Sequence, residues 1–521
     1  MKSYAVPLFL LAISIAISFA NIGGLDIYAL DEAKNAEAAR EMFESGNYVV
    51  PYFSGELRTD KPSLHYYFMS AGYALFGVGA FGARFFSSLF AVLTIVLTYF
   101  FVKKHFNYKA AVYAVLVLLS SLHFHIQFHM SVPDPYLIFF LTWAFYSFYN
   151  AYATKSRWAL LSFYVAIGCG LLTKGPIAMA LPGISVVTFL LYQRDFRWST
   201  IVRLQPFGGV LMSLLIAFPW YYKVHLATEG AWTEGFFFKH NLNRFAEPFE
   251  GHDGFFLLPF VFVLMGFLPF LPFIAQSVKS SFRHKNDLSS FSLICALVIV
   301  IFFAFSSTKL PNYTTPAYPL LAIVLGNYLS KIDIDWFKNK WNFIGFTLYG
   351  LLLLAFPLGI YFGLKADKNL GDINFLGYYF IPLGLFGLLW WLKRKQAVFV
   401  LHSNIVLWII TSFLFFQFIF PQVDKQNPVR QLLPTMNTED NRIIAYQQFN
   451  SAFVFSLQKI IPRFATPTEI ESEMAKHNSG YVISRKSRLA ELLEIEGLEY
   501  HGEFQDLFEN PTTLIMRWGN P

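Results

Sequence analysis

Long apolar stretches are the feature of this sequence that most limits its fold. A helix that crosses a bilayer needs about 20 consecutive, mostly apolar residues. Such stretches recur between residues 4 and 420 and predict about thirteen membrane-spanning helices. They lie near residues 4–20, 82–102, 110–126, 135–152, 157–173, 176–192, 205–222, 254–276, 288–305, 314–330, 341–364, 373–392 and 397–420. Only 14% of the 521 residues are charged, against about 25% in soluble domains, which excludes a soluble globular enzyme.

The distribution of Lys and Arg predicts the orientation of these helices. Lys and Arg gather in alternate short loops, for example at residues 103–109, 193–204 and 277–287. The short loops between them are almost free of cations, and positive loops face the cytoplasm. The net charge of +7 is therefore assigned to cytoplasmic loops rather than to nucleic-acid binding. The N-terminus is expected inside, in a multi-pass protein of the cytoplasmic (inner) membrane.

Two long loops and the C-terminal tail are expected on the outer side. Residues 1–421 form the predicted all-α transmembrane domain, with outside loops at residues 21–81 and 223–253. Residues 422–521 are more polar, and "SGYVISRKS", "RLAELLEI" and "TTLIMRW" have the patterns of a strand, a helix and a strand. These residues predict a small α/β domain outside the membrane.

Unusual polar residues fall on this outer side although they come from separate loops. Ionisable groups at membrane depth are costly and usually mark a site. Two acids and several cations in one outward cavity suit an anionic substrate and an acid/base step. The residues concerned are Asp31, Glu32, Asp60, Lys61, Asp134, Lys174, Arg244, His252, Lys309 and Tyr313.

Each of these residues also has a plain structural interpretation. Asp31 and Asp134 stand at helix starts, where a carboxylate caps free N–H groups, and capping and catalysis are compatible for Asp31. Glu32 would gain from the helix dipole, and Gly46 would end the helix that follows. Lys174 can extend to the headgroups from a tight turn between two spans.

Several of these motifs resemble one family when they are taken together and in order. "AREMFESGNYVVPYFSGELRTDKPSLHYY", "SVPDPYL", "LTKGPIA", "HNLNRF" and "SSTKLPNYTTPAYP" resemble the GT-C class of polyprenyl-phosphate-sugar-dependent glycosyltransferases. The bacterial lipid A aminoarabinose transferases and the protein O-mannosyltransferase-like enzymes are the most similar members. The resemblance covers about residues 20–330, and the rest matches in layout only.

The resemblance implies roles for individual residues. Asp31 matches the essential first-loop acid, which acts as general base on hydroxyl acceptors, and Asp134 matches a second acid. Lys61 matches a lysine on the lipid-linked phosphate, while Arg244 and Tyr313 fall in the phosphate-binding cavity. Lys174 and Lys309 sit in recurring motifs.

The resemblance also bears on metal ions. The aminoarabinose transferases usually have Glu where this chain has Asp60, and that Glu with a loop His, matched by His252, is implied to hold a divalent metal ion. No nucleotide cofactor is expected, because the sequence contains neither a Walker A pattern nor a dinucleotide fingerprint.

The implied reaction moves a sugar from undecaprenyl phosphate to an envelope acceptor, with inversion at the anomeric carbon. A lipid A-type glycolipid is the first expected acceptor and a protein is the second. A flippase or transporter of lipid-linked sugars is the alternative from another class. It predicts broken helices and ionisable residues near mid-membrane, whereas the marked residues here gather at one face.

Overall fold

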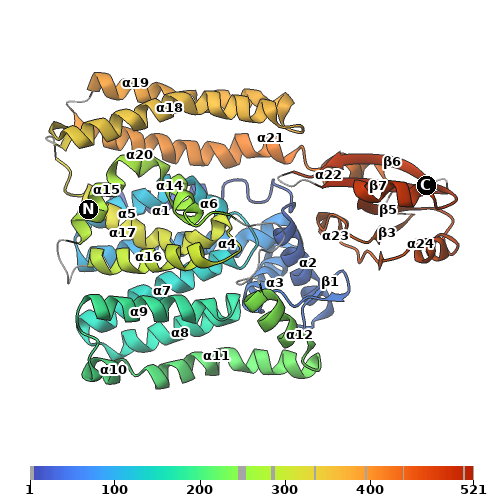
Figure 1. Ribbon diagram of the computed structural model, residues 1–521, viewed down its shortest axis with the longest axis horizontal. Coiled ribbons are helices and arrows are strands. Elements are labelled where there is room, and N and C mark those ends of the chain that lie inside the picture. Colours follow the sequence, from blue (N-terminus) through green and yellow to red (C-terminus); the bar gives the residue numbers. More distant parts are fainter. Residues whose placement is uncertain are drawn as a thin grey trace.

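The structure is a computed structural model that describes residues 5–243, 254–282, 288–333, 336–393, 396–437, 439, 441–507 and 511–519. Long helices lie side by side in one bundle, and a small sheet lies beyond one end of it (Figure 1). In lipid every backbone polar group must be paired within the segment, so apolar runs of this length form helices.

The long helices follow the predicted apolar stretches closely. Their bounds are α1 Ala5–Ser18, α4 Ala80–His105, α5 Tyr108–Ser120, α7 Asp134–Thr154, α8 Arg157–Lys174, α9 Ile177–Tyr192, α11 Pro206–Ala227, α16 Leu288–Phe305, α17 Tyr318–Leu329, α18 Lys340–Ala366, α19 Ile381–Lys393 and α20 Ala397–Leu414. The predicted mostly helical membrane fold is thereby confirmed in its coarse form.

Not every helix of the bundle is long and apolar enough to cross a membrane by itself. Within the described residues, five helical segments are long and apolar enough to cross a membrane, or seven if two bent pairs each count as one. Two shorter apolar helices, α1 and α9, add to these. The count of about thirteen spans stays a prediction.

Two of the predicted straight spans are bent. The stretch 110–126 breaks by 70° between α5 and α6 (Leu122–Phe128). The stretch 254–276 breaks by 80° after α14 (Leu258–Gly266). The two breaks meet, because the Ser121 hydroxyl donates to the Gly266 carbonyl at 2.7 Å. The same hydroxyl accepts from the backbone N–H of Phe124. Ser121 therefore caps the start of α6 and also bonds to the end of α14.

Residues 21–81, which are predicted to form the first outside loop, make a compact helical unit. Helix α2 (Leu30–Ser45) ends at Gly46, whose φ of 70° is the left-handed conformation predicted for this glycine. A hairpin of β1 (Tyr52–Phe53) and β2 (Glu56–Leu57) follows, and then α3 (Leu64–Phe76). Both turn residues of the hairpin, Ser54 and Gly55, have positive φ, as a two-residue type I′ turn requires.

The C-terminal residues form a five-stranded mixed sheet of order β4-β3-β5-β7-β6. Strand β3 is parallel to β4 and β5, whereas β7 is antiparallel to β5 and β6. The segments expected as strand, helix and strand form β5, α25 and β7. The bounds are β3 Arg442–Tyr446, α23 Ala452–Leu457, β4 Arg463–Phe464, α24 Pro467–Met474, β5 Gly480–Arg485, α25 Leu489–Leu493, β6 Leu498–Gln505 and β7 Thr512–Trp518.

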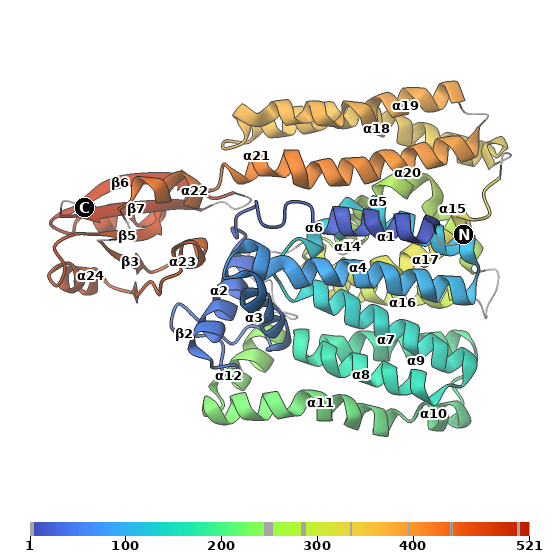
Figure 2. The ribbon, with the colours of Figure 1, turned by 180° about the vertical axis from the view of Figure 1, so that it is seen from behind.

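The sheet is fastened to the first loop rather than hanging free. Helix α23 packs against α2, and both views place the sheet beside this loop (Figures 1 and 2). The apolar core around α2 continues into Phe453 and Ile483, while the far side of the sheet has a core of its own. The division into domains at residue 421 stays a prediction.

Candidate active site

Asp31 lies at the centre of the candidate site, in the first turn of α2. The residue that caps this helix is Ala29, which makes no side-chain cap bond. The capping role considered for Asp31 is therefore wrong, because Asp31 lies inside the first turn, beyond the cap position. Its side chain is 52% exposed, which leaves it open to a substrate.

Arg58 organises the acids of the first loop. Its buried guanidinium lies 3.6 Å from the Asp31 carboxylate and 2.9 Å from that of Asp60. It also donates to the Tyr66 hydroxyl and to the Asn35 side-chain carbonyl. Arg58 is not among the residues predicted for the site, although it lies two residues before Asp60 in the motif "LRTDKPSLHYYF".

Lys61 adds a second buried cation, with 8% of its surface exposed. The surrounding protein alone would raise the pKa of Asp31. The positive charges of Lys61 and then Arg58 outweigh this effect and hold that pKa below its ordinary value of 3.8. Asp31 is therefore an anion at neutral pH.

Asp60 bonds to a histidine other than the expected one. The His240 ring nitrogen Nε2 lies 2.8 Å from the Asp60 carboxylate, at the end of the π-helical turn η1 (Gly235–Asn243). Burial alone would raise the pKa of Asp60, but Arg58 and His240 outweigh it and lower that pKa. The expected partner His252 and the expected phosphate ligand Arg244 lie outside the described residues.

These contacts bear on the implied metal ion. The second Asp60 oxygen is already paired with the Arg58 guanidinium. Within the described part of the chain, no group of three His, Cys, Asp or Glu side chains could hold a metal ion. The described donor set alone does not fit a divalent metal, and no catalytic step is derived through one.

Glu32 faces away from Asp31 into the protein. Its carboxylate pairs with Arg84 at 2.7 and 2.8 Å and accepts from the Ser131 backbone N–H. Glu32 is 2% exposed. This buried ion pair joins the start of α2 to α4 and to the loop before α7.

Asp134 and Lys174 form a second cluster, where α7 begins and α8 ends. The Lys174 ammonium donates to the buried Asp134 carboxylate at 2.7 Å, and Asn312 donates to the same oxygen at 3.2 Å. Pro133, not Asp134, occupies the cap position of α7, so the capping role considered for Asp134 is wrong. The interpretation of Lys174 as a residue that extends to the headgroups is also wrong, because its charge is held inward.

Tyr313 and Lys309 lie in the segment between α16 and α17. The Tyr313 ring centre lies 5.1 Å from the Lys174 ammonium, in the turn η3 (Pro311–Ala317). Lys309 donates to the Ser306 carbonyl at 2.8 Å. Lys174 also helps to lower the pKa of Asp31, so this cluster acts on the same carboxylate as Lys61 and Arg58.

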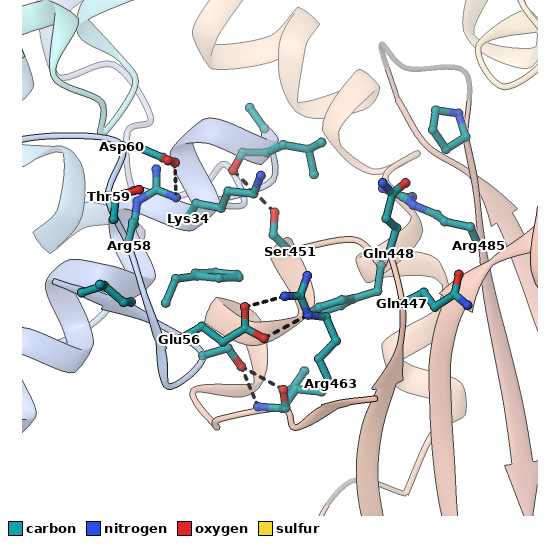
Figure 3. A pocket seen from close by; sticks show the side chains of 18 of the residues that line it. Lys34, Glu56, Arg58, Thr59, Asp60, Gln447, Gln448, Ser451, Arg463 and Arg485 are labelled. Carbon is teal, nitrogen blue, oxygen red and sulfur yellow. Dashed lines mark hydrogen bonds and ion pairs between the residues drawn. The ribbon is translucent and has the colours of Figure 1, made fainter. Parts of the chain in front are cut away.

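A cavity of about 1120 Å³ is bordered by Arg58, Asp60 and His240. One wall comes from residues 28–30, 34, 53, 54 and 56–60, and the other comes from residues 447–449, 451, 461 and 463 with Arg485. Figure 3 shows Lys34, Arg58 and Asp60 on the first wall and Gln448 and Arg485 across from them. Glu56 and Arg463 meet across the gap at 2.6 Å. None of the residues predicted for the site lies on the second wall.

Comparison with known proteins places these residues in context. Residues 60–222 match the family model described as dolichyl-phosphate-mannose-protein mannosyltransferase. The match includes Asp60, Lys61, Asp134 and Lys174 and begins after Asp31. The chain is 27% identical to an uncharacterized protein of Aquifex aeolicus over 80% of this chain and 78% of that protein.

Two relatives have informative names. The undecaprenyl phosphate-alpha-4-amino-4-deoxy-L-arabinose arabinosyl transferase of Shewanella sediminis is 32% identical over 64% of this chain, which spans 60% of that protein. The crystal structure of ArnT from Cupriavidus metallidurans bound to undecaprenyl phosphate superposes with a TM-score of 0.78 and 20% identity, over 98% of both chains. The fold is therefore the fold of ArnT over nearly its whole length. In sequence and in fold, the chain resembles the GT-C glycosyltransferases and, among them, the aminoarabinose transferases.

Proposed function

We propose that the protein is an integral membrane glycosyltransferase. It moves a sugar from a polyprenyl (undecaprenyl) phosphate carrier to an envelope acceptor, first of all lipid A or a related glycolipid. The observation that carries the proposal is the Asp31 carboxylate, accessible to a substrate and surrounded by the charges of Arg58, Lys61 and Lys174. The named relatives and the ArnT fold support it.

The donor phosphate belongs on the cationic side of Asp31. Breaking the anomeric C–O bond leaves the electron pair, and hence growing negative charge, on the departing phosphate. Preorganised cations stabilise this charge in the transition state. Lys61 and Lys174 supply them among the described residues, and Arg244 is proposed to join them. Asp134 positions Lys174, Tyr313 flanks its ammonium, and Lys309 contributes at the edge of the same cluster.

The acceptor attacks the anomeric carbon from the opposite face, so a single displacement inverts that carbon. A hydroxyl acceptor loses its proton as the new C–O bond forms, and Asp31 is proposed to take that proton. A carboxylate within hydrogen-bond reach contributes roughly 10²–10⁴-fold. A phosphate acceptor is already an anion and needs positioning rather than deprotonation, so we propose that Asp31 contributes less to that reaction. We assign Glu32 to positioning, since Arg84 and Ser131 occupy its carboxylate.

The proposed enzyme lies in the inner membrane with its site and C-terminal sheet on the periplasmic side. The concentration of Lys and Arg in the loops at the other end supports this orientation. A metal ion is not needed for these steps. Asp60 instead holds Arg58 and His240 in place.

Release of undecaprenyl phosphate tests the proposal. Purified protein is incubated with a panel of undecaprenyl-phosphate sugars and with envelope lipids or proteins, and products are followed by mass spectrometry. We expect release by the wild type and a loss of at least 100-fold in Lys61→Ala. Asp31→Asn should lose a similar factor with a hydroxyl acceptor and less with a phosphate acceptor.

Two exposed residues provide matched controls. Glu229→Gln removes an acid and Lys223→Ala removes a lysine, both on the surface and away from the cavity. Both should retain wild-type release. No release from any donor, in folded protein, would sink the proposal and direct attention to lipid transport, which vesicle-based translocation of the same lipids would measure.

A protein acceptor is the second candidate. The match of residues 60–222 to the mannosyltransferase family model favours it. The same assay separates the two, because the sugar appears either on extracted glycolipid or on protein.

A further inference from the structure

We propose that Asn35 is a positioning residue for the transfer reaction, and that its amide oxygen holds the Arg58 guanidinium close to Asp31 but short of a direct hydrogen bond. Asn35 is buried and acts through Arg58 rather than on the substrate. This inference rests on the proposed function, because it concerns the state of Asp31 as the base.

Asn35 occupies a position where its own helix gains little from it. It lies inside α2, and none of its surface is exposed. Asn is a poor residue for a helix interior, because its side chain competes with the backbone for hydrogen bonds. A buried amide also costs free energy unless its polar atoms are paired. The groups that Asn35 bonds therefore explain its presence.

Three groups converge on the amide oxygen of Asn35. The Arg58 guanidinium donates to this oxygen at 3.2 Å, and the Tyr66 hydroxyl donates to it at 3.3 Å. The His65 ring nitrogen Nε2 lies 3.2 Å from the same oxygen. Because an arginine side chain has donors only, the atom that it meets is the acceptor of the amide, and His65 donates to it through Nε2. The amide nitrogen donates to the Asp31 backbone carbonyl at 2.7 Å.

The Arg58 guanidinium is therefore held from one side by neutral groups. Its Nε donates to the Tyr66 hydroxyl at 3.1 Å, and that hydroxyl donates its own hydrogen to Asn35. Burial raises the pKa of Tyr66 to about 12, so the hydroxyl keeps its proton at neutral pH. Because neither Asn35 nor Tyr66 carries a charge, the positive charge of Arg58 still acts on the acids at its other side.

The resulting distance decides how Arg58 affects Asp31. The guanidinium Nη2 lies 3.6 Å from the Asp31 carboxylate, whereas N–H···O hydrogen bonds are about 2.7–3.2 Å long. Burial alone would raise the pKa of Asp31, and the charges around it lower that pKa in total; they belong to Lys61, Arg58, Asp60 and Lys174. Arg58 therefore keeps Asp31 ionised and leaves its oxygens free to take a proton from the acceptor.

Asn35→Leu removes the amide oxygen and keeps a similar volume. Nη2 of Arg58 then loses its neutral acceptor and is expected to turn to Asp31, which makes the carboxylate a weaker and less accessible base. We expect kcat with a hydroxyl acceptor to fall about 10- to 100-fold. KM for the lipid-linked donor should stay at its wild-type value, because Lys61 and Lys174 are unchanged.

A double-mutant cycle of Asn35→Leu and Arg58→Gln tests the inference. Asn35→Leu should cause no further loss of kcat when Arg58→Gln is already present, because Asn35 acts only through Arg58. A double variant whose loss equals the product of the two single losses overturns the inference. A raised donor KM with unchanged kcat in Asn35→Leu also overturns it. Asn35→Ala carries the same expectation and takes its place if the leucine variant does not fold.

Asn404→Leu is the matched control. Asn404 is likewise a buried helical asparagine, in α20, whose oxygen accepts from a tyrosine hydroxyl, that of Tyr349. Its nitrogen donates to the Pro269 backbone carbonyl. We expect Asn404→Leu to lower the unfolding midpoint and to keep the wild-type kcat. An equal fall in kcat in both variants overturns the inference, because lost stability then accounts for it.

A cryo-electron microscopy structure of Asn35→Leu tests the movement without turnover. We expect the distance from Arg58 Nη2 to the Asp31 carboxylate to shorten from 3.6 Å to about 2.8 Å. An unchanged distance overturns the inference. If the wild type transfers no sugar from any donor, the proposed function fails, and this distance still judges whether Asn35 holds Arg58 in place.

Discussion

At the scale of single residues, two neighbouring acids have opposite surroundings. Asp31 is half exposed and meets Arg58 at 3.6 Å, whereas the buried Glu32 meets Arg84 at 2.7 Å. Adjacent helical residues point about 100° apart, so Asp31 stays accessible to solvent while Glu32 faces Arg84 of α4. Breaking a buried ion pair by removing one partner leaves an uncompensated charge.

Glu32→Gln should therefore reduce stability far more than Asp31→Asn does. We expect a loss of about 3–5 kcal/mol, because Arg84 stays charged and buried. Thermal unfolding in detergent measures it. Glu32→Gln/Arg84→Met, which removes both charges, should recover most of the loss. Equal unfolding midpoints for wild type and Glu32→Gln would contradict the assignment of Glu32 to a structural ion pair.

The rate of transfer to a hydroxyl acceptor should depend on pH through Asp31. Because the pKa of Asp31 is lowered from 3.8 in the folded protein, the carboxylate stays mostly charged as the pH falls to 3.8. It adds stability above pH 3.8, and this contribution disappears as the pH falls through the folded-state pKa. The acid limb of the kcat/KM profile should thus lie below pH 4.

Lys61→Ala should shift that acid limb to higher pH, because the largest charge that lowers the pKa of Asp31 is then gone. The residual activity of the variant suffices for the profile. The control Lys223→Ala should leave the acid limb at the wild-type pH. If Lys61→Ala also left it there, the charge of Lys61 would not control the pKa of Asp31.

At the scale of elements, the turn between α8 and α9 supports the turn that carries His240. Gly175 has a φ of 74°, and a Cβ there would lie 2.5 Å from the ring of Phe236 in η1. Phe236 packs in a small aromatic core with Trp220 and Trp232. The glycine in the motif "LTKGPIA" is therefore required by a close approach as well as by its backbone conformation.

Gly175→Ala should displace η1 and weaken the bond between His240 and Asp60. We expect a stability loss of about 1–3 kcal/mol, from overpacking and from the left-handed backbone, and a fall in transfer activity. Unfolding midpoints and initial rates measure both. Gly183→Ala in α9, where a Cβ meets nothing within 4 Å, is the matched control and should be neutral. Full activity in Gly175→Ala would show that η1 does not depend on this contact.

At the scale of the whole molecule, the hairpin of the first loop is bonded to the C-terminal sheet. The Ser54 hydroxyl donates to the Ile461 carbonyl at 3.0 Å and accepts from its N–H at 2.9 Å. The Glu56–Arg463 ion pair lies beside them. These contacts fix the distance between the two walls of the cavity.

Ser54→Gly tests this link without backbone strain, because glycine accepts the φ of 51° that Ser54 has. The Ile461 N–H loses its partner, which costs about 1–3 kcal/mol for a buried donor. We expect faster hydrogen exchange at Ile461 and residues 463–464. Exchange equal to that of the wild type would show that the sheet is held by other contacts.

The sequence could predict the helices and the members of the site, but not their partners. Apolar stretches predict helices because lipid leaves no other way to pair the backbone. Asp31, Asp134 and Lys174 could be selected because charges are rare at these depths. The bond between Asp134 and Lys174 could not be predicted, since it depends on how α7 packs on α8.

Two further features could not be predicted from the sequence. The bend at Ser121 depends on a carbonyl 145 residues away, that of Gly266. The second wall of the cavity consists of ordinary Gln, Ser and Arg side chains, which acquire meaning only through the sheet that presents them.

The two walls of the cavity are far apart in sequence, and this separation affects the chain while it is being synthesised. Ser54 and Ile461 are 407 residues apart, and Tyr28 and Leu507, whose N–H donates to the Tyr28 hydroxyl, are 479 apart. At about 5–20 residues per second, synthesis of the intervening chain takes roughly 20–80 s. Throughout that time the first loop has no C-terminal sheet to pair with. A newly inserted or truncated chain therefore displays the acids and cations of this loop without the second wall of the cavity.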